Sequence, residues 1–128
     1  MARARKRVLI VDDNDVIHEI LLQFLGRAYA VETVANASAA LAVIIRQPPD
    51  AIIMDVKMPG VDGITLLKSI RDMGLQTPVF IITGYDSTPV ALEALQNGAT
   101  GYLPKPFDLL HLDRLLAQSL GTPPVSAA

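Results

Sequence analysis

The chain has 128 residues, which is the usual size of one compact domain. Apolar residues make up 51% of it and charged residues 19%, with a net charge of −2, which excludes a disordered chain and argues against a general nucleic-acid binder. There is no cysteine, so disulfides, thiolate metal sites and a cysteine nucleophile are excluded, as suits a cytoplasmic protein. The longest apolar run, Ala39–Ile45, is far shorter than the ~20 residues that span a bilayer, so we expect no membrane segment.

A basic segment opens the chain. Of the 11 basic residues, Arg3, Arg5, Lys6 and Arg7 lie within the first seven positions, and none of the 13 acidic residues does. A short charged run of this kind is typical of a solvated arm, so residues 1–6 are interpreted as an N-terminal arm that precedes the domain.

Five short apolar runs predict five β-strands. Three of them are rich in β-branched residues and too short for helices, which indicates buried strands; they cover residues 8–11, 51–54 and 79–82. The run over residues 29–34 alternates, with Glu32 between two less polar residues, which favours an edge strand. The pair Tyr102-Leu103 is assigned as the fifth strand from its place in the series.

Segments with helical spacing of apolar residues follow the predicted strands. Each has a start or stop signal in the sequence, such as a capping side chain, a glycine or a proline. The signals are Asn14 and Gly26, then Pro48-Pro49, then Asp62 and Gly74, then Pro89 and Asn97-Gly98, and finally Asp108 and Gly121. Residues 7–121 therefore form the predicted domain, and residues 122–128, which contain Pro123-Pro124, are expected to be a disordered tail or the stub of a linker.

This strand–helix alternation, repeated five times with short links, predicts an α/β fold with a parallel sheet and helices on both faces. Five such units suit a flavodoxin-like (βα)5 doubly wound sheet with strand order 2-1-3-4-5. In that order the second strand, over residues 29–34, lies at an edge of the sheet, which agrees with its alternation of apolar and polar residues.

Polar side chains follow four of the five predicted strands. Asp12 and Asp13 follow the first strand, Asp55 the third, Thr83 the fourth and Lys105 the fifth. Because ligands bind at the carboxyl ends of the strands in such sheets, we expect these residues to converge there. Three carboxylates at one edge repel each other unless cations intervene, and oxygen ligands suit Mg²⁺. A carboxylate beside Mg²⁺, a lysine and a hydroxyl is equipped to attack a phosphoryl group.

Four sequence motifs carry a specific resemblance. They are Val8-Leu9-Ile10-Val11-Asp12-Asp13, the stretch Met54-Asp55-Val56-Lys57-Met58-Pro59-Gly60-Val61-Asp62-Gly63, Thr83-Gly84, and Leu103-Pro104-Lys105-Pro106-Phe107. In this order and at these strand ends, they resemble the motifs of the response-regulator receiver family of two-component signalling, over about residues 7–120.

The resemblance implies a role for each site residue. It makes Asp55 the acceptor of a phosphoryl group and Lys105 the phosphate-binding lysine, which the family follows with a cis bond to Pro106. The roles implied for the other residues are as follows: Mg²⁺ ligands Asp12, Asp13, Asp55 and the backbone carbonyl of Lys57; switch residues Thr83 and Tyr102; and Lys57 and Tyr85 as variable neighbours that modulate the site.

The resemblance also implies the partners of the domain. The phosphoryl donor is a phosphohistidine on a histidine kinase or a histidine phosphotransfer protein. Phosphorylation is expected to change the face made by the fourth helix, the fifth strand and the fifth helix, through which the domain could form a homodimer. Such a domain is a cytoplasmic regulatory module that assists its own phosphotransfer and dephosphorylation, not an enzyme acting on other substrates, and binds neither nucleic acid nor membrane.

Three other functions fit parts of the pattern. A receiver-like module that only binds partners is disfavoured by the complete set of site residues. A haloacid-dehalogenase-type phosphatase with an aspartyl-phosphate intermediate carries a second aspartate two residues after its nucleophile, where Lys57 stands here. A flavin carrier is disfavoured because no evident Ser/Thr-rich phosphate loop follows the first strand.

Overall fold

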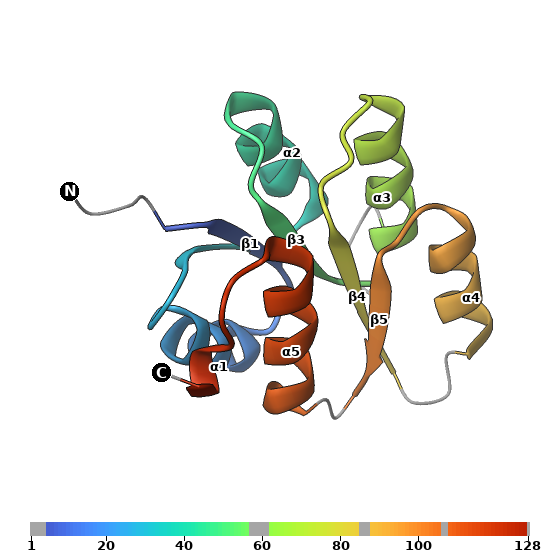
Figure 1. Ribbon diagram of the computed structural model, residues 1–128. Helices are drawn as coiled ribbons and strands as arrows, with labels where there is room; N and C mark the ends of the chain where they lie inside the picture. The colour runs from blue at the N-terminus through green and yellow to red at the C-terminus, as the bar shows by residue number, and fades with distance from the viewer. Residues whose placement is uncertain (1–4, 57–61, 85–87, 106–107, 128) are drawn as a thin grey trace.

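The computed structural model describes residues 5–56, 62–84, 88–105 and 108–127 (Figure 1). Strands and helices alternate along the chain as the sequence predicts. The elements are β1 (Arg7–Val11), α1 (Asp15–Leu25), β2 (Ala30–Val34), α2 (Ala37–Arg46), β3 (Ala51–Asp55), α3 (Gly63–Asp72), β4 (Val79–Thr83), α4 (Thr88–Gln96), β5 (Gly101–Pro104), α5 (Leu109–Leu120) and a short 3-10 helix, η1 (Val125–Ala127).

The five strands form one parallel sheet in the order β2-β1-β3-β4-β5, which confirms the predicted topology. All residues of β3 and β4 are buried, and β2 at the edge is half-exposed. The order switches between β1 and β3, so the carboxyl ends of these two strands flank the crevice where ligands bind in such sheets.

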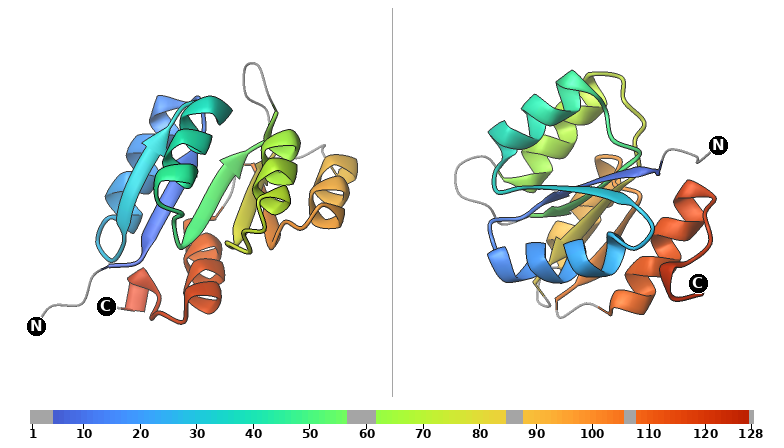
Figure 2. Two further views of the ribbon diagram at one scale, coloured as in Figure 1. Left: turned by 90° about the horizontal axis from the view of Figure 1, so that it is seen from above. Right: turned by 90° about the vertical axis from the view of Figure 1, so that its left-hand side faces the viewer.

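Helices cover both faces of the sheet (Figure 2). On one face α2, α3 and α4 pack on residues such as Ile52 and Ile81, and on the other α1 and α5 pack on residues such as Ile53 and Phe80. The two sets alternate along each strand because successive side chains of a strand point to opposite faces. Two apolar layers therefore hold the sheet from both sides, and its carboxyl ends are rigidly placed.

The predicted helix caps are confirmed. The side chains of Asn14, Asp62 and Asp108 accept hydrogen bonds from backbone N–H groups in the first turn of α1, α3 and α5. At the other end of α5, Gly121 adopts the left-handed conformation, with φ 66° and ψ 33°. Glycine takes this conformation at no steric cost, so the helix ends there and the chain changes direction.

The residues after α5 differ from the sequence-based expectation of disorder or a linker. Thr122–Ala127, which we call the C-terminal segment, folds back on the domain, with the Val125 side chain buried in the apolar cluster between the sheet and α1 and α5. One apolar residue in a segment rich in proline and small residues is too weak a pattern to predict packing. The contact depends instead on Asp113 and Tyr29, which are far away in the sequence.

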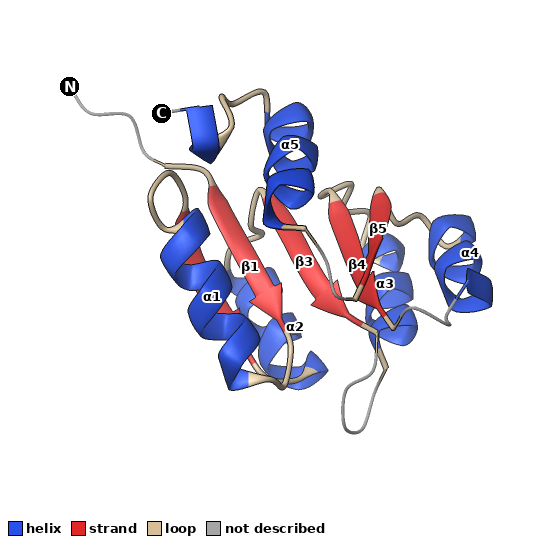
Figure 3. Ribbon diagram, turned by 90° about the horizontal axis from the view of Figure 1, so that it is seen from below, coloured by secondary structure: helices blue, strands red, loops and turns tan. Residues whose placement is uncertain are grey.

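The two ends of the described chain lie at the end of the sheet opposite the carboxyl ends of its strands (Figure 3). At the start of the chain, Arg5 Nη1 donates a hydrogen bond to the carbonyl oxygen of Gly26 at 2.6 Å. Among the described residues, no helix is both long and apolar enough to cross a membrane.

Candidate functional site

The carboxyl ends of the strands bring the predicted site residues together. Asp12 directly follows β1, Asp55 ends β3, and Lys105 directly follows β5. Asp12, Asp13 and Asp55 each offer one carboxylate oxygen, and these three oxygens lie within 4.8 Å of one another. The convergence that the sequence predicts is therefore present for the acidic residues.

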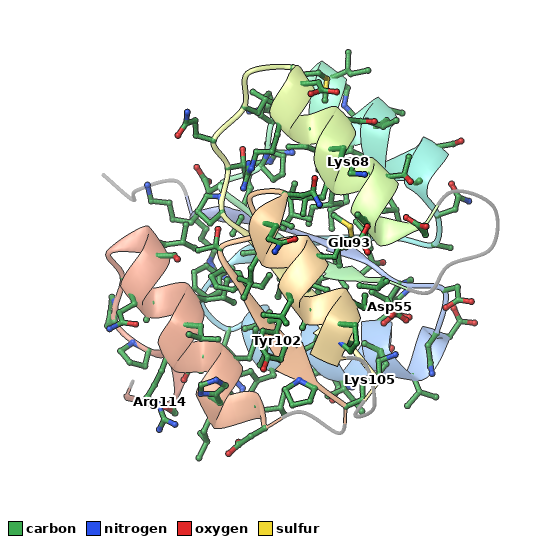
Figure 4. The ribbon with its side chains drawn as sticks, turned by 90° about the vertical axis from the view of Figure 1, so that its right-hand side faces the viewer. Asp55, Lys68, Glu93, Tyr102, Lys105 and Arg114 are labelled. Carbon is green, nitrogen blue, oxygen red and sulfur yellow. The ribbon has the colours of Figure 1, made fainter. Side chains whose placement is uncertain are left out.

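Lys105 supplies a positive charge inside this acidic cluster (Figure 4). Its Nζ donates to Oδ2 of Asp55 at 3.0 Å, and its backbone N–H donates to the carbonyl oxygen of Thr83 at 2.6 Å. The Lys105 side chain is one-third exposed, with 34% of its surface accessible, whereas only 8% of the Asp55 side chain is accessible. An ion pair this close to the sheet edge is partly shielded from water, which strengthens it.

Asp12 is the most deeply buried carboxylate of the cluster, with 1% of its surface exposed. Its Oδ1 accepts the Asn14 N–H at 2.9 Å, and its buried Oδ2 has no hydrogen-bond partner among the described residues. Burial raises the pKa of the Asp12 carboxyl, and so do the charges of Asp55 and Asp13; the hydrogen bond from Asn14 and the charge of Lys105 act in the opposite direction. Among the described residues, the cluster holds three carboxylates and one ammonium group, so its negative charges outnumber its positive ones.

The donor set fits a hard divalent cation. Mg²⁺ prefers oxygen ligands, and Asp12, Asp13 and Asp55 each offer a carboxylate oxygen. A cation bound by Asp12 could also satisfy its Oδ2, which has no hydrogen-bond partner among the described residues. Asp13 is exposed, so a cation held by it also keeps water ligands. Mg²⁺ usually keeps several waters and binds through one or two carboxylates, which agrees with a site that is open on one side.

Two further predicted residues lie on the β4–β5 side of the site. Thr83 is 3% exposed at the end of β4, and Tyr102 is 41% exposed on β5. Tyr102 pairs in register with Ile81, two residues before Thr83, so Tyr102 and Thr83 occupy the same face of the sheet. In Figure 4, Tyr102 lies between α4 and α5.

Three predicted features fall outside the described residues. They are the Lys57 backbone carbonyl and side chain, Tyr85, and the peptide bond between Lys105 and Pro106. Their assignment stays a prediction.

Sequence reasoning misses two contacts at the site. It identifies Asn14 only as a helix cap, but the Asn14 backbone N–H also binds Asp12; the two-residue spacing from Asp12 is typical of an Asx turn and signals this contact. A Cβ atom on Gly63 would lie 2.7 Å from the Asp55 carbonyl oxygen and 2.9 Å from Val56 Cα. Only glycine allows α3 to begin so close to the end of β3. The motif resemblance fits Gly63 to the loop beneath Asp55, but the backbone contact itself follows from the fold.

Known proteins match this sequence and this architecture. The model of the response regulator receiver domain family matches residues 8–117, which is most of the chain. The chain belongs to this family. Its members occur in two-component signal transduction, so the chain is a regulatory receiver domain.

Relatives with this domain are longer than the chain. The regulatory protein AtoC of Escherichia coli is 37% identical over 118 residues, which cover 91% of this chain and 26% of AtoC. The response regulator MprA of Mycobacterium leprae is 37% identical over 124 residues, which cover 95% of this chain and 54% of MprA. The receiver domain thus spans about a quarter of AtoC and about half of MprA.

Solved structures give the same result for the fold. A putative response regulator from Chloroflexus aurantiacus superimposes with a TM-score of 0.86 at 34% identity, covering 91% of this chain and 98% of that one. The signal receiver domain of an HD domain-containing protein from Pseudomonas fluorescens also has a TM-score of 0.86, at 29% identity, covering 94% of this chain and 90% of that one.

Proposed function

We propose that Asp55 accepts a phosphoryl group from a phosphohistidine of a histidine kinase or a histidine phosphotransfer protein. The observation that carries this proposal is the contact of Asp55 with Lys105 at 3.0 Å inside a cluster of three carboxylates. This contact places a nucleophilic carboxylate oxygen next to a cation that binds phosphoryl oxygens, as an aspartyl acceptor requires.

In this reaction a carboxylate oxygen of Asp55 attacks phosphorus, the O–P bond forms, and the N–P bond to the donor imidazole breaks. Lys105 stabilises the charge on the phosphoryl oxygens, and the Thr83 hydroxyl donates a hydrogen bond to them. Asp12, Asp13 and Asp55 would hold Mg²⁺, with the Lys57 carbonyl as the further ligand that the family resemblance implies; a bound ion would neutralise charge on the phosphoryl group. Water attack on the acyl phosphate returns free Asp55, so the domain assists its own dephosphorylation.

Phosphorylation then changes the α4-β5-α5 face. Thr83 moves toward the new phosphoryl oxygens, and Tyr102, on the same face of the sheet, turns into the space that this movement leaves. The charge of the phosphoryl group thereby favours one of two packing arrangements of Thr83 and Tyr102. The exposed side chains of Leu92, Leu95 and Tyr102 make this face suitable for a partner or a second copy. The domain works in the cytoplasm and does not itself bind nucleic acid.

Labelling tests the acceptor. Incubation with acetyl phosphate and Mg²⁺ is expected to give one acid-labile, hydroxylamine-sensitive adduct, which Asp55→Asn abolishes and Asp72→Asn leaves unchanged. Asp72 is an exposed acid at the end of α3, so its substitution makes the same charge change away from the site. Wild-type labelling of Asp55→Asn would overturn the assignment, and no labelling of the wild type would favour a receiver-like module that acts by binding alone.

The metal ligands and the switch need separate measurements. Asp13→Ala is expected to lose more Mg²⁺ affinity than Asp12→Ala; equal affinities of both variants and the wild type would contradict this ligand set. Amide hydrogen exchange with and without beryllofluoride is expected to change in α4, β5 and α5, and changes confined to α1 and α2 would refute the switch. Turnover of phosphate esters would instead identify a phosphatase.

A further inference from the structure

The C-terminal segment lies outside residues 8–117, which match the family, so its role has to come from its own contacts. After Gly121 the Thr122 N–H donates to the Ala117 carbonyl oxygen at 3.1 Å, and the chain reverses direction. It then runs back beside α5 toward α1, as Figures 1 and 3 show. The segment therefore packs on an edge of the domain that is distinct from the acidic cluster.

A buried carboxylate anchors the segment. Asp113, on α5, is fully buried, and its carboxylate accepts three hydrogen bonds from the C-terminal segment. The donors are Val125 N–H at 2.7 Å, Ser126 N–H at 3.0 Å and Ser126 Oγ at 2.8 Å. An aspartate is rarely buried completely unless its oxygens are bonded. Asp113 therefore recognises two consecutive backbone N–H groups and one hydroxyl.

An apolar and a polar contact complete the recognition. The Val125 side chain is 5% exposed and belongs to the apolar cluster that contains Tyr29, Leu25 and Leu116. The Tyr29 hydroxyl and Thr122 Oγ1 are 2.9 Å apart and share a hydrogen bond. We call this receiving surface the α1–α5 socket; it consists of Leu21, Leu25, Tyr29, Leu112, Asp113 and Leu116.

The C-terminal segment has the features of a unit that can detach while the rest of the domain stays folded. Of its residues with described burial, Val125 alone is buried, and Pro123 and Ser126 are exposed. A unit that buries little apolar surface opens at a lower free-energy cost than the core of the sheet. The segment follows Gly121, whose φ of 66° is a left-handed conformation that glycine adopts without strain. Opening also returns the Asp113 carboxylate to water, which leaves no buried charge without a partner.

We propose that the α1–α5 socket is a peptide-binding site that the chain's own C-terminal segment occupies, and that a partner protein displaces this segment with one of the same chemistry. The segment now in the socket defines that chemistry: a stretch with a β-branched apolar side chain followed by serine, and two consecutive N–H groups for Asp113. Because the C-terminal segment is part of the same chain, its effective concentration at the socket is high. The socket therefore stays occupied by this segment until a competing peptide makes additional contacts.

Amide hydrogen exchange on the full chain tests the opening. The Val125 and Ser126 amides are expected to exchange at least tenfold faster than amides of β3 such as Ile53, and Ser126→Ala is expected to accelerate them further. Ser119→Ala, on an exposed position of α5, is the matched control and leaves them unchanged. If both amides exchange only at the rate of global unfolding, the segment is a fixed part of the fold and the proposal is wrong.

Peptide titration tests the binding. An amidated peptide with the sequence of residues 122–128 is titrated into full-length Val125→Ala/Ser126→Ala, which weakens the occupant but keeps the socket, and nuclear magnetic resonance follows Tyr29 and Leu112. Saturable shifts are expected, with affinity at least tenfold above wild type, and a peptide with aspartate in place of valine gives none. If the double variant does not fold, Ser126→Ala replaces it. Absence of saturable shifts up to millimolar peptide refutes the proposal.

Discussion

Neutralising Asp12 is expected to stabilise the metal-free protein, although it weakens the site. In Asp12→Asn the side chain keeps its shape and its acceptor for the Asn14 N–H. It loses a buried charge whose Oδ2 has no hydrogen-bond partner among the described residues. An unsatisfied buried charged group costs about 1–3 kcal/mol, and repulsion from Asp55 adds to that cost while Lys105 offsets part of it. We therefore expect the free energy of unfolding to rise by about 1–3 kcal/mol, which corresponds to a melting temperature roughly 3–12 °C higher for a chain of this size.

The assay is urea and thermal denaturation in EDTA, followed by circular dichroism. Asp72→Asn, which removes one exposed charge outside the cluster, is expected to change the free energy of unfolding by less than about 0.5 kcal/mol. Mg²⁺ at about 1,000 times its Kd for the wild type should reverse the order, because it stabilises the wild type by about 4.1 kcal/mol and binds the variant more weakly. If Asp12→Asn in EDTA is no more stable than Asp72→Asn, the electrostatic reasoning fails.

The advantage of Asp12→Asn also has a defined pH dependence. Because burial and the charges of Asp55 and Asp13 raise the pKa of Asp12 above 3.8, against the opposing effects of Asn14 and Lys105, the folded state keeps this proton to higher pH than the unfolded chain does. Ionisation of Asp12 then costs stability as the pH rises from about 3.8 through the raised pKa. The difference between the variant and the wild type should therefore be largest at neutral pH and shrink on acidification.

Three other substitutions test separate parts of the structure. Gly63→Ala places a Cβ against the backbone of Asp55, so urea denaturation should show a loss of about 1–3 kcal/mol, together with slower labelling by acetyl phosphate; unchanged stability would mean that α3 shifts freely. Lys57→Met should strengthen Mg²⁺ binding if the Lys57 ammonium competes with the ion for the carboxylates; the gain should be at most about fivefold, because an exposed ion pair contributes only ~0–1 kcal/mol, and it should shrink at high salt. Unchanged or weaker affinity at low salt would reject this competition and leave Lys57 as a solvated side chain. Burial raises the pKa of Asp113, but the hydrogen bonds from the C-terminal segment and the positive charge of Arg114 lower it on balance. The ionised Asp113 should therefore stabilise the folded protein above about pH 4, and this stabilisation should be lost as the pH falls further. A difference in stability between Asp113→Asn and the wild type that stays constant from pH 7 to pH 3 would contradict this.

The sheet and the acidic cluster follow from local patterns. Buried strands such as β3 are continuous apolar runs, and each ends where the run meets a polar residue, so Asp55 can be placed at a strand end from the sequence alone. Parallel topology then brings such ends together. The helix caps at Asn14, Asp62 and Asp108 are equally predictable, because a capping side chain acts on backbone groups two or three residues away.

The contacts that the sequence did not predict are those between distant residues. Val125 is buried because Asp113 binds its N–H and because the apolar cluster of α1 and α5 leaves room for it, and neither fact is local to residues 122–128. The close approach of Gly63 to Asp55 likewise depends on how α3 packs on the end of β3. The sequence likewise predicts that Lys105 and Asp55 lie near each other, but only the structure shows that Lys105 Nζ donates a hydrogen bond to Asp55 Oδ2.

The position of the two chain ends has a practical consequence for experiments on this domain. Both ends of the described chain lie on the side of the molecule away from the acidic cluster (Figure 3). A fluorescent reporter or an affinity handle joined at either end would therefore leave the approach of a bulky phosphoryl donor to Asp55 open. An attachment at the carboxyl end would follow directly on the residues that pack on Asp113, however, whereas one before Arg5 would lie apart from that contact. Surface immobilisation for binding measurements is thus best made through the amino end.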